Sequence, residues 1–108
     1  MRLLGRLRAL LGGAAPDEIR VRVILKGRIG AGWYDVDQQL PLPAGATLAT
    51  LIERAERRGI ALQRAIADSP HLRHTLMWNG QRAPVDENLG RALADGDQIY
   101  LLGPLAGG

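Results

Sequence analysis

The sequence predicts an α+β domain in which a mixed sheet of four to five strands packs on one main helix. Two observations predict it. The first half of the chain holds two segments with an apolar residue at every second position, followed by a segment with apolar residues at helical spacing. The second half returns twice to short apolar runs, which are bounded by the turn sequences Asn79-Gly80 and Asp95-Gly96-Asp97. A hairpin, a helix and two returning strands favour a sheet with one face covered.

Length and composition fit one globular domain. The chain has 108 residues, 46% of them hydrophobic, which suffices for one core but not for two ordinary domains. Cysteine is absent, so disulfides, thiolate metal ligands and a cysteine nucleophile are excluded, and a reducing cytoplasm is compatible. The net charge is only +3, with 4% aromatic residues and scattered arginines, which argues against nucleic-acid binding. No apolar run approaches the roughly 20 residues that span a bilayer, so we expect a cytoplasmic protein without a membrane anchor.

Residues 1–18 are predicted to be an amphipathic leader and a linker. On a helical wheel the leucines of this segment fall within an arc of about 120°, and the arginines lie outside it. The leucines are Leu3, Leu4, Leu7, Leu10 and Leu11, and the arginines are Arg2, Arg6 and Arg8. Gly12-Gly13 ends this helix. Such a segment could lie on a membrane or dock on a partner, but we favour one that packs on its own domain or frays.

Residues 19–29 and 33–42 are predicted to form a β-hairpin. In the first strand the aliphatic side chains alternate with basic ones, and in the second an alternating pattern runs from Tyr34 to Leu42. The first strand turns one face to the core with Ile19, Val21, Val23 and Leu25. The glycines of "GRIGAG" predict a long turn between the strands, and Pro41 and Pro43 are expected to stop the second one.

The main helix is predicted to begin after Thr47, a good N-cap residue. Apolar residues follow at positions i, i+3, i+4 and i+7, Glu53 and Arg57 are spaced as an ion pair, and Gly59 supplies a left-handed stop. Residues 61–68 are predicted as a second, shorter helix before Ser69-Pro70.

Residues 72–84 are predicted as a strand and a turn, because the segment alternates and contains Asn79-Gly80, a strong hairpin signal. A short helical or irregular segment, the Asp95-Gly96-Asp97 bend and a last strand through Ile99 and Leu101 complete the domain. This layout is that of the ubiquitin-like β-grasp. We expect the β-grasp domain over residues 19–102 and a flexible tail over residues 103–108.

Within the chain, no set of residues predicts an active site. His71 and His74 have no further His or Cys to complete a zinc site, and in a strand their spacing places them on opposite faces. Ser69, the only serine, lacks the G-x-S-x-G setting of a nucleophile elbow. Asp95 and Asp97 flank a turn glycine, which explains them structurally. We therefore expect no metal, no bound cofactor and no catalysis by this chain itself.

The tail offers a different chemistry. Pro104 does not extend the last strand, and Leu105, Ala106, Gly107 and Gly108 follow it. Extended, residues 103–108 span roughly 20 Å, enough to enter a partner's cleft. Because glycine has no Cβ, Gly107-Gly108 can pass a narrow channel and present a carboxylate. That carboxylate becomes a reactive acyl group only after a partner enzyme adenylates it with ATP.

The residues after the third strand resemble the ubiquitin-like sulfur carriers, the family of the molybdopterin synthase small subunit and the thiamine-pathway carrier. The matching features are Trp78-Asn79-Gly80, Leu93 before Asp95-Gly96-Asp97, an apolar last strand and the final Gly107-Gly108. The resemblance covers about residues 19 to 108. The chain departs from the molybdopterin-type pattern at Gly103-Pro104, where that subunit usually has two prolines, and the leader lies outside the pattern.

The resemblance implies a carrier that acts with partner enzymes. A ubiquitin-activating-like adenylyltransferase would adenylate Gly108 with ATP, and the adenylate would become a thiocarboxylate. The carrier would then hand its sulfur to an acceptor enzyme such as a molybdopterin synthase large subunit, in cofactor biosynthesis of the molybdopterin type rather than the thiamine type.

Two other functions remain open at the level of the sequence. The first is a ubiquitin-like modifier that is conjugated through Gly108 to a lysine amine, and the second is a β-grasp interaction domain that acts non-covalently. In each case we expect the exposed face of the sheet beside the last strand to bind a partner, with Leu101, Leu102 and Leu105 as candidates. Since strand neighbours point to opposite faces, at least one of Leu101 and Leu102 must be core.

Overall fold

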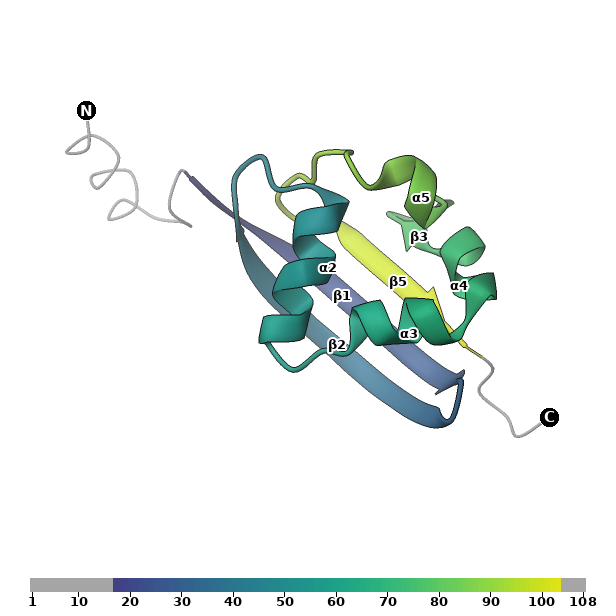
Figure 1. The fold of residues 1–108 in the computed structure, drawn as a ribbon. Coiled ribbons are helices and arrows are strands. Elements are labelled where there is room, and N and C mark those ends of the chain that lie inside the picture. Colours follow the sequence, from purple (N-terminus) through teal and green to yellow (C-terminus); the bar gives the residue numbers. More distant parts are fainter. Residues whose placement is uncertain (1–16, 104–108) are drawn as a thin grey trace, which may run out of the picture.

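The described part of the chain folds as a five-stranded sheet with helices on one of its faces (Figure 1). The computed structural model describes residues 17–103, so most of the predicted leader and all of residues 104–108 lie outside the described residues. The elements follow one another as β1 (Glu18–Ile29), β2 (Gly32–Pro43), α2 (Leu48–Arg57), α3 (Leu62–Asp68), α4 (Pro70–Thr75), β3 (Met77–Trp78), β4 (Gln81–Arg82), α5 (Val85–Asn88) and β5 (Gln98–Leu102).

The last strand lies in the middle of the sheet. The strand order is β2-β1-β5-β3-β4, and β5 runs parallel to β1, with Arg22 opposite Gln98 and Lys26 opposite Leu102. The other neighbouring strands are antiparallel. A parallel pair requires a long crossover between its strands, and the segment that contains the helices supplies it. The sheet is therefore mixed, as the sequence predicts.

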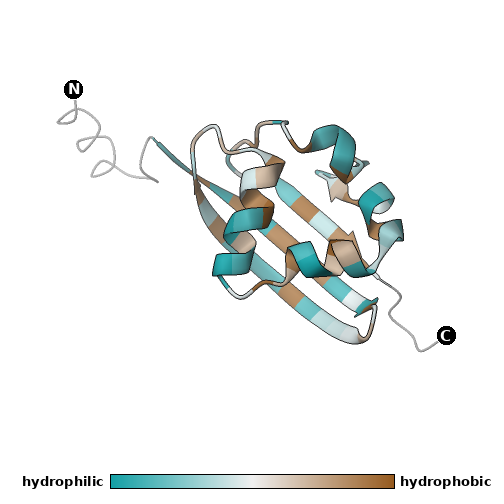
Figure 2. Cartoon of the chain, in the orientation of Figure 1, coloured by the Kyte–Doolittle hydropathy of each residue, from teal (hydrophilic) through white to brown (hydrophobic). Residues whose placement is uncertain are grey.

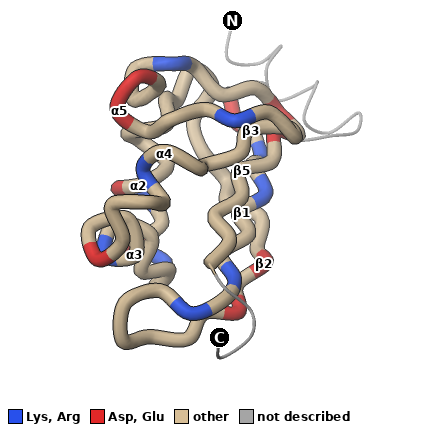
Figure 3. Tube along the Cα trace, turned by 90° about the vertical axis from the view of Figure 1, so that its right-hand side faces the viewer, with Lys and Arg blue, Asp and Glu red and all other residues tan. Residues whose placement is uncertain are grey.

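Two layers build the core. Figure 3 shows the sheet edge-on, with the helices on one side of it. The side chains of β1 that the sequence assigns to the core are buried, and the positions between them, Arg20, Arg22 and Ile24, are partly or fully exposed on the other face. Figure 2 shows the alternation of hydropathy along the strands. The central part of this layer comes from Val21, Val23, Leu25, Ile99 and Leu101, all with no exposed surface, packed against Leu48, Leu51, Leu62 and Ala65.

The first hairpin is longer and its turn is tighter than the sequence predicts. Ile29 pairs with Gly32, so only Gly30 and Ala31 form the turn, and Gly30 takes a φ of +58°. The prediction of a long glycine-rich turn is therefore wrong. The prediction that Pro41 stops the strand is also wrong, because β2 continues to Pro43. As β2 is an edge strand, a proline can sit where no ladder N–H is needed.

The main helix forms as predicted. The Thr47 side chain caps α2 by accepting a hydrogen bond from the Thr50 backbone N–H, at 3.3 Å. Arg57 pairs with Glu53 at 3.2 Å, and Gly59 follows the helix with a φ of +79°. The three shorter helices complete the cover on the same face, and α3 confirms the second predicted helix.

One predicted strand is a helix for most of its length. Residues 70–75 form α4, and the third strand is only Met77–Trp78. Ser69 is extended and Pro70 stands in the first turn, where its fixed φ favours a helix and its missing N–H costs nothing. Leu72 and Leu76, which are four residues apart, are both buried. Alternation at Leu72, His74 and Leu76 also fits this i, i+4 spacing, so the period alone was ambiguous.

Asp97 joins the two predicted turns. Its carboxylate accepts hydrogen bonds from the Trp78 indole N–H at 3.1 Å, the Asn79 amide at 2.8 Å and the Ala94 backbone N–H at 2.8 Å. In return, the Asn79 side-chain oxygen accepts from the Gln98 backbone N–H at 2.8 Å. The Asn79-Gly80 turn and the Asp95-Gly96-Asp97 bend are thus fixed to each other at the start of β5.

The hydrogen bonds that Asp97 accepts, called the clamp below, also shift the pKa of its carboxyl group. Partial burial raises the pKa of this carboxyl, but the hydrogen bonds from Ala94, Asn79 and Trp78 and the charge of Arg91 outweigh that effect. The pKa therefore lies below its ordinary value. The Arg91 guanidinium lies 4.0 Å from the centre of the Trp78 ring, an attractive cation–π arrangement.

Candidate functional site at the end of the last strand

The end of β5 is the place where the chain leaves a rigid body. β5 is paired on both sides, and two of its side chains, Ile99 and Leu101, are fully buried. One residue past the strand, the Gly103 backbone N–H donates to the Lys26 carbonyl oxygen at 2.7 Å. Because β1 and β5 are parallel, this end lies beside the β1–β2 turn (Figure 1).

Gly103 is required by contact rather than by its backbone angle. A Cβ added to it would lie 2.5 Å from the carbonyl oxygen of Arg28 and 3.0 Å from the Ile29 side chain. Real Cβ atoms essentially never come that close to backbone, so a side chain here would displace the strand end. The sequence alone offers Gly103 only as part of a tail.

The five predicted tail residues, Pro104, Leu105, Ala106, Gly107 and Gly108, lie outside the described residues. The roles assigned to them from the sequence, partner contact by Leu105 and covalent chemistry at Gly108, stay predictions. What the structure gives is their point of departure at Gly103.

Leu101 and Leu102 divide between the two faces of the sheet. Leu101 is fully buried in the core, whereas Leu102 is 54% exposed. The expectation that at least one of the pair is core is confirmed. Partner contact by either residue stays a prediction, but a core side chain offers no surface to a partner, so Leu102 is now the better candidate.

Leu102 lies on an open face of the sheet that no helix of the described chain covers. Register places the side chains of paired residues on the same face. Leu102 pairs with Lys26, and Lys26 pairs with Asp35, so these three side chains lie on the open face. Two residues further along β1, Arg28 and its partner Trp33 lie on the same face. Trp33 is 62% exposed, the largest exposed aromatic side chain of the described residues. The open face thus carries two exposed apolar side chains at the end where the chain departs.

The open face is also basic. The register assigns to it five bases and three acids: Arg20, Arg22, Lys26, Arg28 and Arg82 against Glu18, Asp35 and Asp37. Figure 3 shows these charges along the strand side of the molecule. Sequence reasoning missed Trp33 and this charge pattern, although the alternation of bases along β1 already signals it.

Two ion pairs neutralise Asp35 and Asp37 of the open face. Arg22 holds Asp37 with two hydrogen bonds, Nε to Oδ1 at 2.8 Å and Nη2 to Oδ2 at 2.6 Å. The bond from Arg22 lowers the pKa of the Asp37 carboxyl and raises that of the Arg22 guanidinium. Lys26 lies 3.5 Å from Asp35. The remaining bases give this face a surplus of positive charge, suited to an acidic partner surface.

The two histidines do not lie where the sequence predicts them. His71 and His74 lie on α4, not on a strand, so the expectation that they occupy opposite strand faces is wrong. Both are exposed. Between residues 17 and 103, no three His, Cys, Asp or Glu side chains come together as metal ligands. None of the helices in that range has the length and apolarity that a bilayer crossing requires.

Solved structures share this architecture at low sequence identity. The solution structure of the HVO 2177 protein from Haloferax volcanii matches 90% of this chain and 93% of its own, with 18% identity and a TM-score of 0.55. The crystal structure of SAMP1 from Haloferax volcanii matches 82% of this chain and 99% of its own, with 17% identity and a TM-score of 0.50. The chain has the ubiquitin-like β-grasp fold.

This β-grasp assignment confirms the fold class that the sequence predicts. No protein-family model matches the chain, and no curated protein matches it either. Likeness at this level of identity concerns the fold, and one β-grasp fold hosts several functions. The nearer relation to the sulfur carriers therefore stays a prediction.

Proposed function

We propose that this β-grasp protein is a sulfur carrier whose Gly108 carboxyl group is adenylated and converted to a thiocarboxylate. The observation that supports it most is the anchoring of β5 in the middle of the sheet. The strand leads directly into Gly103, where only a glycine fits. A carrier must hold its reactive end at a fixed distance from the surface that a partner grips. An anchored strand that leads into a short tail meets this need.

The chemistry needs two balanced steps, both in partner active sites. The Gly108 carboxylate attacks the α-phosphorus of ATP, which forms an acyl adenylate and releases pyrophosphate. A sulfide-level donor then attacks the acyl carbon, which forms the thiocarboxylate and releases AMP. The β-grasp domain supplies no catalytic group to either step, and ATP binds to the activating partner.

In this proposal the activating enzyme binds the open face of the sheet. Leu102 and Trp33 provide exposed apolar contact next to the departure point, and the basic surplus would steer the domain toward an acidic patch on the partner. Aromatic side chains and arginines are the residue types that most often dominate binding energy at interfaces. We propose molybdopterin-type biosynthesis as the pathway, on the resemblance of residues 78–108.

The test is intact-mass spectrometry of the full chain after incubation with ATP, a candidate adenylyltransferase and a sulfide donor. We expect the mass gain of one oxygen exchanged for one sulfur, localised to Gly108 by fragmentation. A variant that lacks Gly107 and Gly108 is expected to gain nothing and to fail in ATP–pyrophosphate exchange. Gly90→Ala, a glycine change in open space, serves as the matched control.

Protein conjugation shares the adenylation step with sulfur transfer. The same experiment separates the two functions by their products. Adducts joined through Gly108 to lysines of other proteins, with no thiocarboxylate, would show that the protein is a ubiquitin-like modifier and not a sulfur carrier. Full biological activity of the variant without the two glycines would leave only a non-covalent interaction domain.

A further inference from the structure

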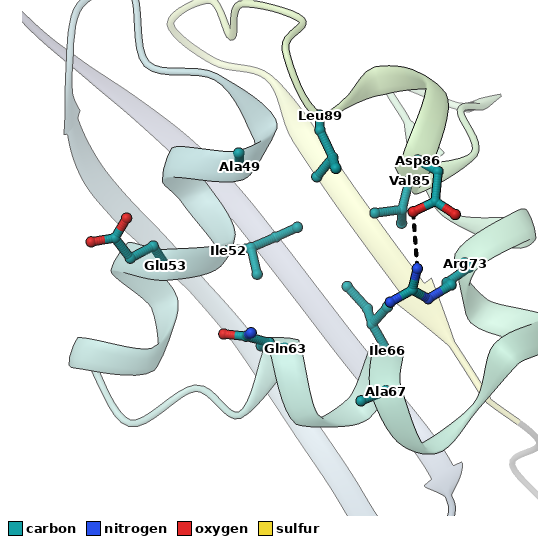
Figure 4. A pocket seen from close by; sticks show the side chains of 10 residues that line it. All are labelled: Ala49, Ile52, Glu53, Gln63, Ile66, Ala67, Arg73, Val85, Asp86 and Leu89. Atoms are coloured by element: carbon teal, nitrogen blue, oxygen red, sulfur yellow. Dashed lines mark hydrogen bonds and ion pairs between the residues drawn. The ribbon is translucent and has the colours of Figure 1, made fainter.

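A groove of about 460 Å³ opens among the helices, on the side of the molecule away from the open face. Figure 4 shows its lining, which comes from α2, α3, α4 and α5 and the turn after α5. Ile66 and Val85 form an apolar floor and belong to the core, and Ile52 is partly buried beside them. Leu89 leans over the groove and is 38% exposed. Pockets of about 300–1,000 Å³ with such lining bind apolar groups.

Each of the two acids on the rim of the groove is paired with an arginine, so the rim is close to neutral. Glu53 and Asp86 stand on it with one base, Arg73, which is held to Asp86 at 3.0 Å. Glu53 pairs with Arg57 of its own helix. An apolar floor under a rim without surplus charge suits the apolar face of an amphipathic helix.

The first eleven residues of this chain are predicted to form such a helix. Five leucines share one face of their predicted helix, three arginines flank it, and no acid is present. The same three arginines account for the whole net charge of +3, because the eleven other bases of the chain equal its eleven acids in number. The open face of the sheet has a surplus of bases, so it repels this segment, whereas the groove side does not.

The segment also enters the domain at a suitable place. Asp17 shares a surface hollow with Arg54 and Arg58, so the described chain begins beside α2. The groove is lined by Ala49, Ile52 and Glu53 of that same helix. A helix with its side chains is about 10–12 Å across, and residues 12–16 span about 17 Å when extended. The linker is long enough to carry the leader over α2.

We propose that residues 1–11 form a helix whose leucine face docks in the groove between α2, α3 and α5 of the same chain. Docking covers Leu89 and Ile52, the apolar side chains that the helices leave partly exposed. The tether makes binding intramolecular and raises the local concentration of the segment to the millimolar range. This proposal is independent of the chemistry at Gly108.

A spin label on the full chain tests the docking. Because the chain has no cysteine, Ala9→Cys gives a single nitroxide site, placed opposite the leucine arc. We expect strong paramagnetic broadening of the amide signals of Gln63, Ala67 and Leu89, and none at Gln39 on the open face. Leu7→Gln and, separately, Leu89→Gln are each expected to reduce the broadening at Gln63 severalfold, whereas Arg20→Gln on the open face leaves it unchanged.

Each other outcome overturns the proposal. Broadening that appears only when spin-labelled chain is mixed with separate isotope-labelled chain means that a second copy occupies the groove. Broadening at Gln39, or none in the domain, means that the segment does not dock there. Binding to phosphatidylcholine–phosphatidylserine vesicles without broadening at the groove identifies a membrane-surface segment instead. Amide signals that keep their positions in each variant, away from the groove and the substituted residue, show that folding is intact.

Discussion

The two faces of the sheet are made from the same strands by the same alternation, yet one is buried under the helices and the other is open. On the helix side, β1 and β5 bury Val23, Leu25, Ile99 and Leu101 completely. On the open side, the alternate positions of the same strands are only partly buried or exposed, among them Arg22, Lys26 and Leu102. The comparison shows that one step along a strand changes a side chain from a buried core position to an exposed surface position.

The adjacent leucines of β5 give the sharpest test of this difference. We expect Leu101→Ala to lower the free energy of unfolding by about 2–5 kcal/mol, because it leaves a cavity in the core. Leu102→Ala should change it by less than about 0.5 kcal/mol, since the side chain is half exposed. Urea denaturation of both variants measures the two effects, and equal losses would contradict the assignment of faces.

The clamp that holds the start of β5 is the next target. Asp97→Ala removes three hydrogen bonds to a carboxylate and should cost about 2–3 kcal/mol in unfolding free energy. Asp95→Ala is the matched control, because that carboxylate accepts a single bond, from the Arg20 backbone N–H at 2.8 Å, and should cost about 1 kcal/mol. If both variants lose the same stability, the clamp is not centred on Asp97.

The same clamp predicts a pH dependence. The pKa of Asp97 is lower in the folded chain than in the unfolded one, so the folded state binds fewer protons. Its contribution is complete above the unfolded value of about 3.9 and is lost as pH falls through the folded pKa. We expect stability measured by denaturation from pH 7 to pH 3 to fall less steeply in Asp97→Asn than in the parent chain. A variant as acid-sensitive as the parent would exclude this carboxylate as a source of the fall.

A substitution at Gly103, where the chain leaves the sheet, is expected to have a smaller effect on the free energy of unfolding. Gly103→Ala forces a Cβ against the Arg28 carbonyl oxygen and should cost about 1–2 kcal/mol through local displacement of the strand end. Gly90→Ala meets nothing within 4 Å and should be neutral or slightly stabilising. Thermal unfolding compares the two, and a neutral Gly103→Ala would show that the strand end yields easily.

The open face is where stability and function should separate most clearly. Trp33→Ala removes a side chain that is 62% exposed, so we expect almost no change in unfolding. In ATP–pyrophosphate exchange with the activating enzyme, the proposed function predicts a severalfold rise in KM, since an exposed aromatic anchor is lost. Leu89→Ala, an exposed leucine on the helix side, is the control and should leave KM unchanged.

Local chemistry in the sequence predicted much of the fold. The alternation along residues 19–25 assigned the buried face, Thr47 and Gly59 delimited the main helix, and Asn79-Gly80 located a hairpin. These signals act over a few residues, so a single sequence carries them completely. The candidate site was predictable to the same extent: the last strand and the division between Leu101 and Leu102 follow from period two.

Other features depend on contacts between distant segments. Residues 70–75 alternate like a strand, and only packing against the sheet decides for a helix. The tight turn at Gly30-Ala31 follows from the register of two long strands, which no single glycine specifies. Gly103 must be glycine because Arg28, which is far away in the sequence, brings its carbonyl oxygen against it.

The sequence by itself thus determined which segments alternate, where the main helix starts and that Asn79-Gly80 is a hairpin turn, because these depend on near neighbours along the chain. Only the tertiary structure decided that β5 inserts between β1 and β3 and that residues 70–75 join the helical layer. Strand order is set by which apolar faces can be covered together, a property of the assembled layers. That choice left Trp33 and Leu102 on one open surface and a groove among the helices on the other.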